Sequence, residues 1–451
     1  MSITALGFLC LFFGSILKAL AGRPIYGLYA YILTLYMYAP GSWWGASLPD
    51  LRWSLMSAVV TLMSIWIYSK PNRRDGGAKN TYDSPWYAGA VVKLYFLFVV
   101  WVWIQNLWAV GAEVHFEYSI IVTKFLLLIY LVNKAVRSLN DLLSIVVVHI
   151  IGCSFFGYIG LTQHAGGRLE SVPTPGMSDG NLLSIHMVPF LIAASYVLLL
   201  DVGKKKYCLI PFIVLTLNAV FLTESRGAIV GLGCAGLLAV FFIAKKQRKL
   251  FTSLAMLALI GGLSLIGEQL LSRLNSTVGD RGEIVDKSAE SRIYIAKAQF
   301  RMFKASPFFG HGHRGTLYLS PEYLDQRWLT SSEGKLVRAS HNITMSILVD
   351  HGLVGLLTYF GAVLAIFYQA LSHRSKIINE EKPIYIVLTG CVLGLFAVMV
   401  TSQLANSMRL EVGIWFIALC SLILQWLARG VNLDWIGKSK QVKNGKVYEL
   451  E

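Results

Sequence analysis

The chain has 451 residues, of which 55% are hydrophobic and only 14% are charged, and its mean hydropathy is +0.58. Soluble domains carry about 25% charged residues, so this composition excludes an ordinary soluble enzyme and indicates a membrane protein. The net charge of +15 does not indicate nucleic-acid binding, because the basic residues lie in short loops without interleaved aromatic side chains. Basic loops next to anionic lipid head groups account for this charge.

Apolar runs recur along the whole chain, each long enough to cross a hydrocarbon core about 30 Å thick. They lack the alternation of membrane β-strands, so we predict an all-α fold, a polytopic membrane helical bundle of about 12–13 spans. The first run has no basic n-region or cleavage site and is either a retained span or a half-inserted helix. The predicted spans are 3–20, 25–40, 53–69, 88–108, 118–135, 141–161, 182–200, 207–222, 227–244, 250–268, 352–371, 383–402 and 411–427.

Every second loop is basic, which is the positive-inside pattern, so the remaining connections are predicted to face outward. The basic loops are 69–79, 134–137, 204–206, 245–249 and 374–376. We expect four parts: an N-terminal transmembrane bundle (1–269), an outer loop domain carrying part of the active site (270–342), C-terminal transmembrane helices (343–430) and a basic cytoplasmic tail (431–451).

Metal-binding patterns are weak in this sequence. All six cysteines lie in or at the ends of apolar runs, so neither a disulfide in the outer loops nor a cysteine metal site is expected. His311 and His313 are one residue apart, without a cysteine or a clear carboxylate partner in the sequence nearby. The pattern favours a polar turn there over a metal site, and we expect no metal and no cofactor.

The long outer stretch, residues 270–340, is basic although it is predicted to face outward. It holds eleven Lys or Arg against seven Asp or Glu, a net charge of +4, and seven of the eleven are arginines. The planar fork of arginine binds phosphate oxygens in pairs, so this stretch suits an anionic ligand such as a lipid pyrophosphate. A solvated mixed-charge loop is the alternative. Within the stretch, Ser288–Lys304 has helical apolar spacing, with Arg292 in it.

Ser340-His341-Asn342 closes this stretch and leads into another apolar run. Because the pKa of an unperturbed imidazole lies near neutral pH, His341 at the water–lipid boundary is a candidate general base acting on a lipid-attached substrate. The alternative is a structural histidine bonded to a backbone carbonyl. After it, Ile343–Asp350 is predicted to be a short helix, and Gly352 and Gly355 allow a bend.

A second arginine lies at the outer surface between two predicted spans, in Thr223-Glu224-Ser225-Arg226-Gly227. Arg226 is either a phosphate clamp facing the bundle or an interfacial arginine whose charge reaches the head groups. Arg168 and Asn181, from the preceding outer loop, are candidates for contacts at the mouth of a substrate cavity on the outer side of the bundle. Asn342 and Arg338 are further candidate contacts beside His341.

These motifs resemble the O-antigen ligase and O-antigen polymerase superfamily. The matching stretches are 222–228, Ser291-Arg292 leading to 306–312, Ser340-His341-Asn342, and 351–355. The region Gly22–Gly27 is similar to exosortase-associated O-glycosylation ligases. The resemblance covers roughly residues 140–360; each motif is short, and their order around one large outer loop is the more specific feature.

The resemblance implies a metal-independent, inverting glycosyltransferase in the bacterial inner membrane, with its active site facing the periplasm. Such enzymes move a glycan from undecaprenyl pyrophosphate to a hydroxyl on lipid A core, another glycan or a protein. It further implies that Arg226 and Arg292 bind the pyrophosphate and that His341 orients or deprotonates the acceptor.

Other functions remain open from the sequence. The exosortase-associated N-terminal resemblance keeps a polysaccharide repeat-unit polymerase as the alternative to a ligase. A lipid-linked oligosaccharide flippase explains the spans but not the arginines and histidine of the outer stretch, and inverted repeats are not evident. A non-catalytic export scaffold would be indifferent to changes at Arg226, Arg292 and His341.

Overall fold

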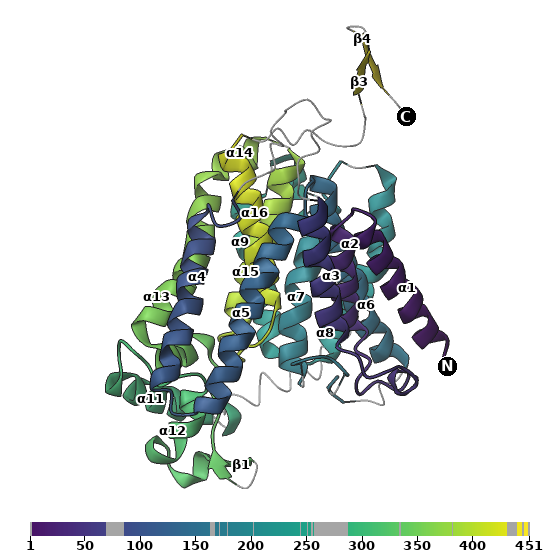
Figure 1. Cartoon of the computed structure of the whole chain (residues 1–451). Helices are drawn as coiled ribbons and strands as arrows, with labels where there is room; N and C mark the ends of the chain where they lie inside the picture. Colours follow the sequence, from purple (N-terminus) through teal and green to yellow (C-terminus); the bar gives the residue numbers. More distant parts are fainter. Residues whose placement is uncertain are drawn as a thin grey trace.

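The computed structural model describes residues 2–68, 85–162, 167–253, 256, 287–380, 382–430, 440–443 and 446–449, apart from positions 171, 178, 202, 244, 250, 333 and 334. Within these residues the chain forms a bundle of helices, with a smaller helical group at one end (Figure 1). The predicted fold class, an all-α polytopic membrane protein, is confirmed.

Among the described residues, eight helical segments are long and apolar enough to cross a membrane. They are α1 (Ile3–Leu20), α4 (Ala90–Ile104) continued by η2 (Gln105–Leu107), α5 (Ala112–Ala135), α6 (Leu139–Thr162), α7 (Gly180–Val197), η3 (Lys204–Leu209) continued by α8 (Ile210–Leu222), α13 (Ile343–Ser372) and α15 (Pro383–Thr401). Shorter apolar helices are α2 (Ile25–Tyr36), α3 (Trp53–Tyr68), α9 (Arg226–Phe242) and α16 (Val412–Ala428).

The remaining elements are short or lie outside the apolar bundle. They are η1 (Gly45–Ser47), η4 (Lys245–Gln247), α11 (Lys287–Ala305), α12 (Gly315–Tyr323), η5 (Gln326–Trp328), β1 (Thr330–Ser332), β2 (Lys335–Val337), α14 (Arg374–Asn379), β3 (Lys440–Lys443) and β4 (Lys446–Glu449). The strands form two antiparallel pairs, in which Thr330 faces Val337 and Lys440 faces Glu449. Twelve of the thirteen predicted spans coincide with apolar helices, and the one at 250–268 lies largely outside the described residues.

Helix α16 lies at the centre of the bundle because it is apolar on every side. Its residues are buried without interruption from Val412 to Trp426. Helix α15 packs against it and against α7, α9 and α13, and 89% of its spanning window is buried. This core fixes the positions of α7, α9 and α13, whose first residues carry the polar motifs of the sequence.

Helix α13 bends at Gly352, where φ is 64° and ψ is −167°. Only glycine adopts this region readily. The bend also lets another segment approach, since a Cβ at this position would lie 2.3 Å from the carbonyl oxygen of Phe308. The backbone N–H of Leu353 donates to the carbonyl of Pro307 at 2.8 Å. The predicted bend after Ile343–Asp350 is therefore confirmed.

The outer helices are attached to the bundle through a small apolar core. Ile295, Ala298 and Met302 of α11 pack with Leu324, which follows α12, and with Val349 of α13. The predicted helix in the outer stretch is confirmed as α11, one residue longer at each end. Its attachment to α13 brings α11 and α12 next to the first part of that helix.

The two ends of the bundle differ in their loops. Helices α11 and α12 and strand β1 lie at one end, whereas α14 and the β3–β4 pair lie at the other (Figure 1). The Arg374 Nε donates to the carbonyl of Phe241 at 3.1 Å, and the Gln247 Nε2 donates to that of Leu199 at 3.2 Å. The basic loops that follow α7, α9 and α13 therefore gather at the end opposite to α11, as the alternation of loop charge predicts.

Candidate active site

Three helices begin at the end of the bundle that carries α11 and α12, each with a side-chain cap. Asn342 accepts a hydrogen bond from the N–H of Met345 at 2.8 Å and caps α13. Ser225 accepts one from the N–H of Ala228 at 3.3 Å and caps α9, and Asp179 caps α7. Helix N-termini carry a positive partial charge, so this end favours an anionic ligand.

Polar contacts connect these three helix starts. The hydroxyl of Ser225 donates to the Oδ1 of Asn181 at 3.1 Å and joins α9 to α7. The N–H of Ile343 donates to the carbonyl of Ser402 at 2.9 Å. The loop after α15 also packs on the start of α9 through Leu404. The motifs around residues 226 and 341 are distant in the sequence but therefore lie at the same end of the bundle.

His341 lies immediately before α13 and keeps an exposed surface. Protein atoms nonetheless withdraw the ring from bulk water and lower its pKa below the usual 6.5. The positive charges of Arg292 and Arg338 lower the pKa further, and the negative charge of Asp179 partly opposes them. At neutral pH the ring is therefore predominantly neutral and is able to accept a proton.

The backbone on both sides of His341 is held by hydrogen bonds. The buried Gln299 of α11 donates from its Nε2 to the hydroxyl of Ser340 at 2.8 Å and to that of Thr316 in α12 at 3.1 Å. The Ser340 hydroxyl in turn accepts from the N–H of Asn342 at 3.2 Å. One glutamine thus couples α11, α12 and the start of α13 and fixes the segment that carries the histidine.

Arg292 and Arg338 approach His341 from the outer segment. Arg292 is half-buried on α11. Arg338 donates from Nη2 to the hydroxyl of Ser291 at 3.3 Å, and its backbone N–H donates to the hydroxyl of Ser320 at 2.7 Å. Both positive charges act on the imidazole, so this part of the site combines a neutral imidazole with cationic side chains.

Arg226 is the first residue of α9 and is half-buried. Arg168 supports the turn before it, because its Nε donates to the carbonyl of Thr223 at 2.7 Å while its Nη1 pairs with Glu170 at 3.0 Å. In this turn Glu224 has φ +46°, an uncommon value for a residue other than glycine. Arg168 therefore shapes the turn that presents Arg226.

The four candidate contact residues of the sequence prediction all have structural partners. Asn342 caps α13, and its Nδ2 donates to the carbonyl of Gln403 at 3.1 Å. Asn181 and Arg168 support the turn before α9, and Arg338 bonds to Ser291. Whether any of them also contacts a substrate stays a prediction.

A cavity of about 930 Å³ lies beside this site, and sequence reasoning did not identify it. It is lined by α11, by the end of α12 and the segment after it, and by Met345 in the first turn of α13. Its aromatic wall includes Tyr294 and Trp328, whose rings stack with centroids 4.9 Å apart. Lys297 and Asp325 add charged groups to the lining. The cavity thus combines an aromatic surface with charged hydrogen-bonding groups.

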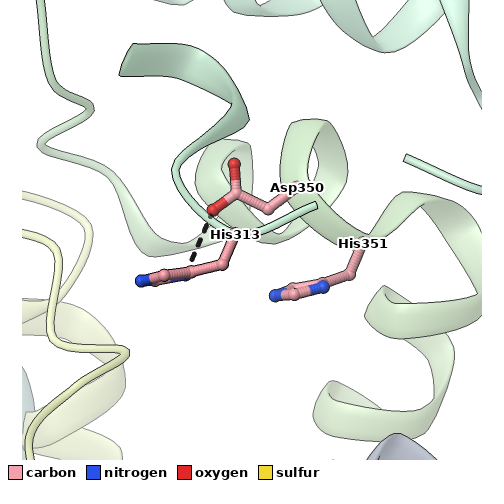
Figure 2. Close-up of side chains that lie close together, drawn as sticks. All are labelled: His313, Asp350 and His351. Atoms are coloured by element: carbon pink, nitrogen blue, oxygen red, sulfur yellow. Dashed lines mark ion pairs between the residues drawn. The ribbon is translucent and has the colours of Figure 1, made fainter. Parts of the chain in front are cut away.

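A second polar cluster lies deeper, around the bend of α13. His313, Asp350 and His351 are buried, and their ligand atoms lie within 4.8 Å of one another (Figure 2). Within the described part of the chain, this is a group that could hold a metal ion. The sequence drew attention to His313 but not to its partners, because Asp350 and His351 belong to a different segment. The signal in the sequence is Asp350-His351, two adjacent polar residues within an apolar run.

The fold is that of a polytopic helical membrane protein, and a histidine and arginines lie together at one end of its bundle. Residues 211–360 match the family model described as O-Antigen ligase. The matched stretch contains Arg226, Arg292 and His341. This match supports the O-antigen ligase superfamily and a membrane enzyme of the O-antigen ligase/polymerase type. No curated protein matches the chain significantly.

Proposed function

We propose that the protein is an inner-membrane glycosyltransferase that moves a glycan from undecaprenyl pyrophosphate to a hydroxyl acceptor on the periplasmic face. The observation that carries the proposal is the exposed imidazole of His341 beside Arg292 and Arg338, where α13 begins. The matched family domain contains these residues and implies a lipid-linked glycan in general terms.

The proposed reaction is a single displacement. The acceptor hydroxyl oxygen bonds to the anomeric carbon of the glycan while the bond from that carbon to the pyrophosphate oxygen breaks. His341 takes the hydroxyl proton, and undecaprenyl pyrophosphate leaves with the bonding electron pair. Arg226 and Arg292 bind the pyrophosphate and stabilise the charge that develops on it. One displacement inverts the anomeric configuration and requires no metal ion at the reacting bond.

The lowered pKa of His341 supports its role as base. Withdrawal from water and the charges of Arg292 and Arg338 favour the neutral ring, which is the form that accepts a proton. A bound pyrophosphate would offset part of the arginine charge and raise the basicity of the ring in the complex. Donor binding and activation of the acceptor would then be coupled through electrostatics.

The neighbouring cavity suits the acceptor. Its volume of about 930 Å³ accommodates a ligand of oligosaccharide size. The stacked Tyr294 and Trp328 offer apolar surface for a sugar ring, and Lys297 and Asp325 offer hydrogen bonds. Met345 lines the cavity four residues after His341, so a glycan bound there would extend towards the base.

Loop charge supports the proposed orientation in the membrane. The basic loops after α7, α9 and α13 gather at the end opposite to α11 and α12. Under the positive-inside rule that end faces the cytoplasm, and the end with His341 faces the periplasm. Residues 270–342 would then form a periplasmic loop domain between two transmembrane parts, with 431–451 as a cytoplasmic tail.

The test uses purified full-length protein in detergent with an undecaprenyl-pyrophosphate-linked glycan and EDTA. Three acceptors are supplied separately: lipid A core, a second lipid-linked glycan and a hydroxyl-bearing peptide. We expect glycan transfer to one of them with release of undecaprenyl pyrophosphate. Transfer to the second lipid-linked glycan would identify a polymerase. Translocation of the donor in vesicles, with no transfer to any acceptor, would overturn the proposal in favour of a flippase.

A further inference from the structure

We propose that His313, Asp350 and His351 bind one divalent transition-metal ion, with Zn²⁺ as the preferred occupant. The Nδ1 of His313 lies 3.6 Å from the Oδ2 of Asp350, and all three ligand atoms lie within 4.8 Å of one another. Two ligands at about 2.0–2.2 Å from a tetrahedral ion stand roughly 3.4 Å apart, so small side-chain rotations complete the geometry. Imidazole and carboxylate are ligands that Zn²⁺ accepts.

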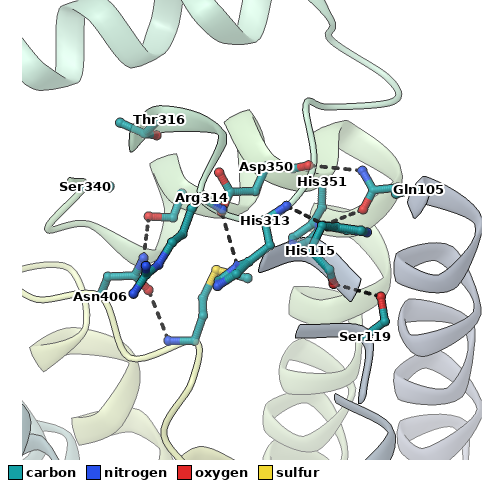
Figure 3. A network of polar contacts seen from close by, with 12 residues as sticks. Gln105, His115, Ser119, His313, Arg314, Thr316, Ser340, Asp350, His351 and Asn406 are labelled. Atoms are coloured by element: carbon teal, nitrogen blue, oxygen red, sulfur yellow. Dashed lines mark hydrogen bonds and ion pairs between the residues drawn. The ribbon is translucent and has the colours of Figure 1, made fainter. Parts of the chain in front are cut away.

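The tautomer of His351 is set by Gln105. The amide nitrogen of Gln105 donates to the carbonyls of Phe309 at 2.6 Å and Asp350 at 3.0 Å. Its oxygen therefore faces the Nδ1 of His351 at 2.5 Å (Figure 3). The proton of His351 is therefore on Nδ1, and Nε2 presents a lone pair. That Nε2 is buried and has no hydrogen-bond partner among the described residues. Such outer hydrogen bonds orient the histidine ligands of metal sites.

His313 is the second unsatisfied histidine. Its ring is 2% exposed, and neither ring nitrogen has a hydrogen-bond partner in the described part of the chain. The ring stacks on Tyr118, with centroids 3.8 Å apart, which fixes its plane. Burying polar nitrogens without partners is costly, and coordination of a metal ion would remove that cost.

The backbone around the cluster is tightly constrained, so the ligands are held in place before any ion binds. The N–H of Gly312 donates to the carbonyl of Asp350 at 2.8 Å, and the N–H of Arg314 donates to the carboxylate of Asp350 at 2.9 Å. Gly310 has φ +68°, and a Cβ there would lie 2.5 Å from the Asp350 carbonyl oxygen. Arg314 has φ +59°, a strained value for a non-glycine residue.

The neighbouring groups limit the site to three protein ligands. Both nitrogens of His115 are engaged: Nδ1 accepts from the N–H of His313 at 2.8 Å, and Nε2 donates to the carbonyl of Val102 at 2.9 Å. Arg314 and Arg409 are the nearby cations; Arg314 is exposed and Arg409 pairs with Glu117 at 3.9 Å. Both side chains keep an exposed surface, so water partly screens their charges, and the fourth metal position is left for a water molecule.

The metal would connect the outer segment to α13. His313 comes from the turn between α11 and α12, whereas Asp350 and His351 precede the bend at Gly352. Asp350 lies about 10 Å along the helix axis from Ile343, at a rise of about 1.5 Å per residue. The ion would therefore hold the segment that carries His341 without contacting the reacting bond, and transfer chemistry at His341 would not use it.

The test measures metal directly. Full-length protein is purified through a tag that binds no metal, its metal content is measured, and chelator-treated protein is titrated with Zn²⁺ and with Co²⁺. We expect stoichiometric Zn²⁺, a visible Co²⁺ absorption band of a low-symmetry site, and a rise in the unfolding temperature on metal addition. Asp350→Asn, which keeps the acceptor for the Arg314 N–H, should lose the band, as should His313→Gln.

His373→Gln, at the opposite end of the bundle, is the matched control and should bind as the wild type does. If chelator-treated wild type binds neither ion, or if Asp350→Asn and His313→Gln bind as well as wild type, the metal site is wrong. If Asp350→Asn fails to fold, His313→Gln decides alone, because the His313 ring makes no hydrogen bond among the described residues and contacts the Tyr118 ring and the Asp350 carboxylate. None of these readouts depends on glycan transfer, so the proposal is tested separately from the proposed function.

Discussion

Two histidines ten residues apart show how the surroundings of an imidazole determine its chemical properties. His341, before the first turn of α13, is exposed and lies among the charges of Arg292, Arg338 and Asp179. His351, just before the bend of the same helix, is fully buried and held by Gln105. The exposed ring can exchange a proton with a substrate, whereas the buried ring offers a fixed lone pair. The two rings differ in their access to solvent and in the hydrogen-bond partner of the ring nitrogen that does not take part in the proposed chemistry.

Among the side chains that surround His341, the arginines should have the largest effect on transfer. Arg292→Ala and Arg226→Ala should each lower the transfer rate by about 10²–10³-fold, because each removes a charge that we propose stabilises the leaving pyrophosphate. Metal binding at His313 should be unchanged in both variants. The measurement is the rate of glycan transfer at saturating donor. Arg374→Ala, at the opposite end of the bundle, is the control, and rates equal to it would remove the two arginines from the site.

The next effect concerns the bend that separates the two histidine regions. Gly352→Ala should destabilise the protein by about 1–3 kcal/mol, because alanine does not tolerate the backbone conformation found there. Gly361→Ala is the matched control in the same helix, where an added Cβ meets only Leu94 side-chain atoms at ordinary contact distance. Thermal unfolding in detergent measures both. Equal unfolding temperatures would mean that the bend is not needed for stability.

A smaller effect distinguishes capping from catalysis next to His341. Asn342→Ala should cost about 1 kcal/mol of stability through loss of the cap on α13, and Asn342→Ser should largely restore it. Transfer should fall far less than in Arg292→Ala. A loss of rate in both variants as large as that of Arg292→Ala, with stability retained, would show that Asn342 contacts the substrate.

The smallest effect is a shift in the pH dependence of transfer. Arg338→Gln removes a positive charge that lowers the pKa of His341, so the pKa should rise. The base is then protonated earlier on acidification, and the acidic limb of the rate profile should move to higher pH. Asp179→Asn should move it to lower pH, because the negative charge of Asp179 raises that pKa. Shifts in the same direction for both variants would contradict the electrostatic account.

The sequence predicted the bundle well because spanning helices need long apolar runs, and these are visible without tertiary information. It also predicted the bend at Gly352 and the helix around Arg292, since glycine placement and apolar periodicity are local signals. It identified His341 as a candidate because a lone imidazole where a polar stretch meets an apolar run is unusual.

The sequence could not identify the contacts between segments. Gln299 couples three helices although nothing in its own neighbourhood marks it. His313 was interpreted as part of a polar turn because its partners, Asp350 and His351, come from α13. The aromatic cavity likewise combines side chains from α11 with those from the end of α12 and the segment after it. Such contacts depend on how helices dock, which apolar periodicity does not specify.

The most direct test of the central claim is the single-turnover rate of glycan transfer by His341→Ala, compared with wild type and with His373→Ala, at neutral pH in EDTA. Loss of the general base should lower the rate by about 10²–10⁴-fold. His373→Ala should match the wild type, and His341→Ala should bind the lipid-linked donor normally. Transfer by His341→Ala at the wild-type rate would contradict the assignment of His341 as the base.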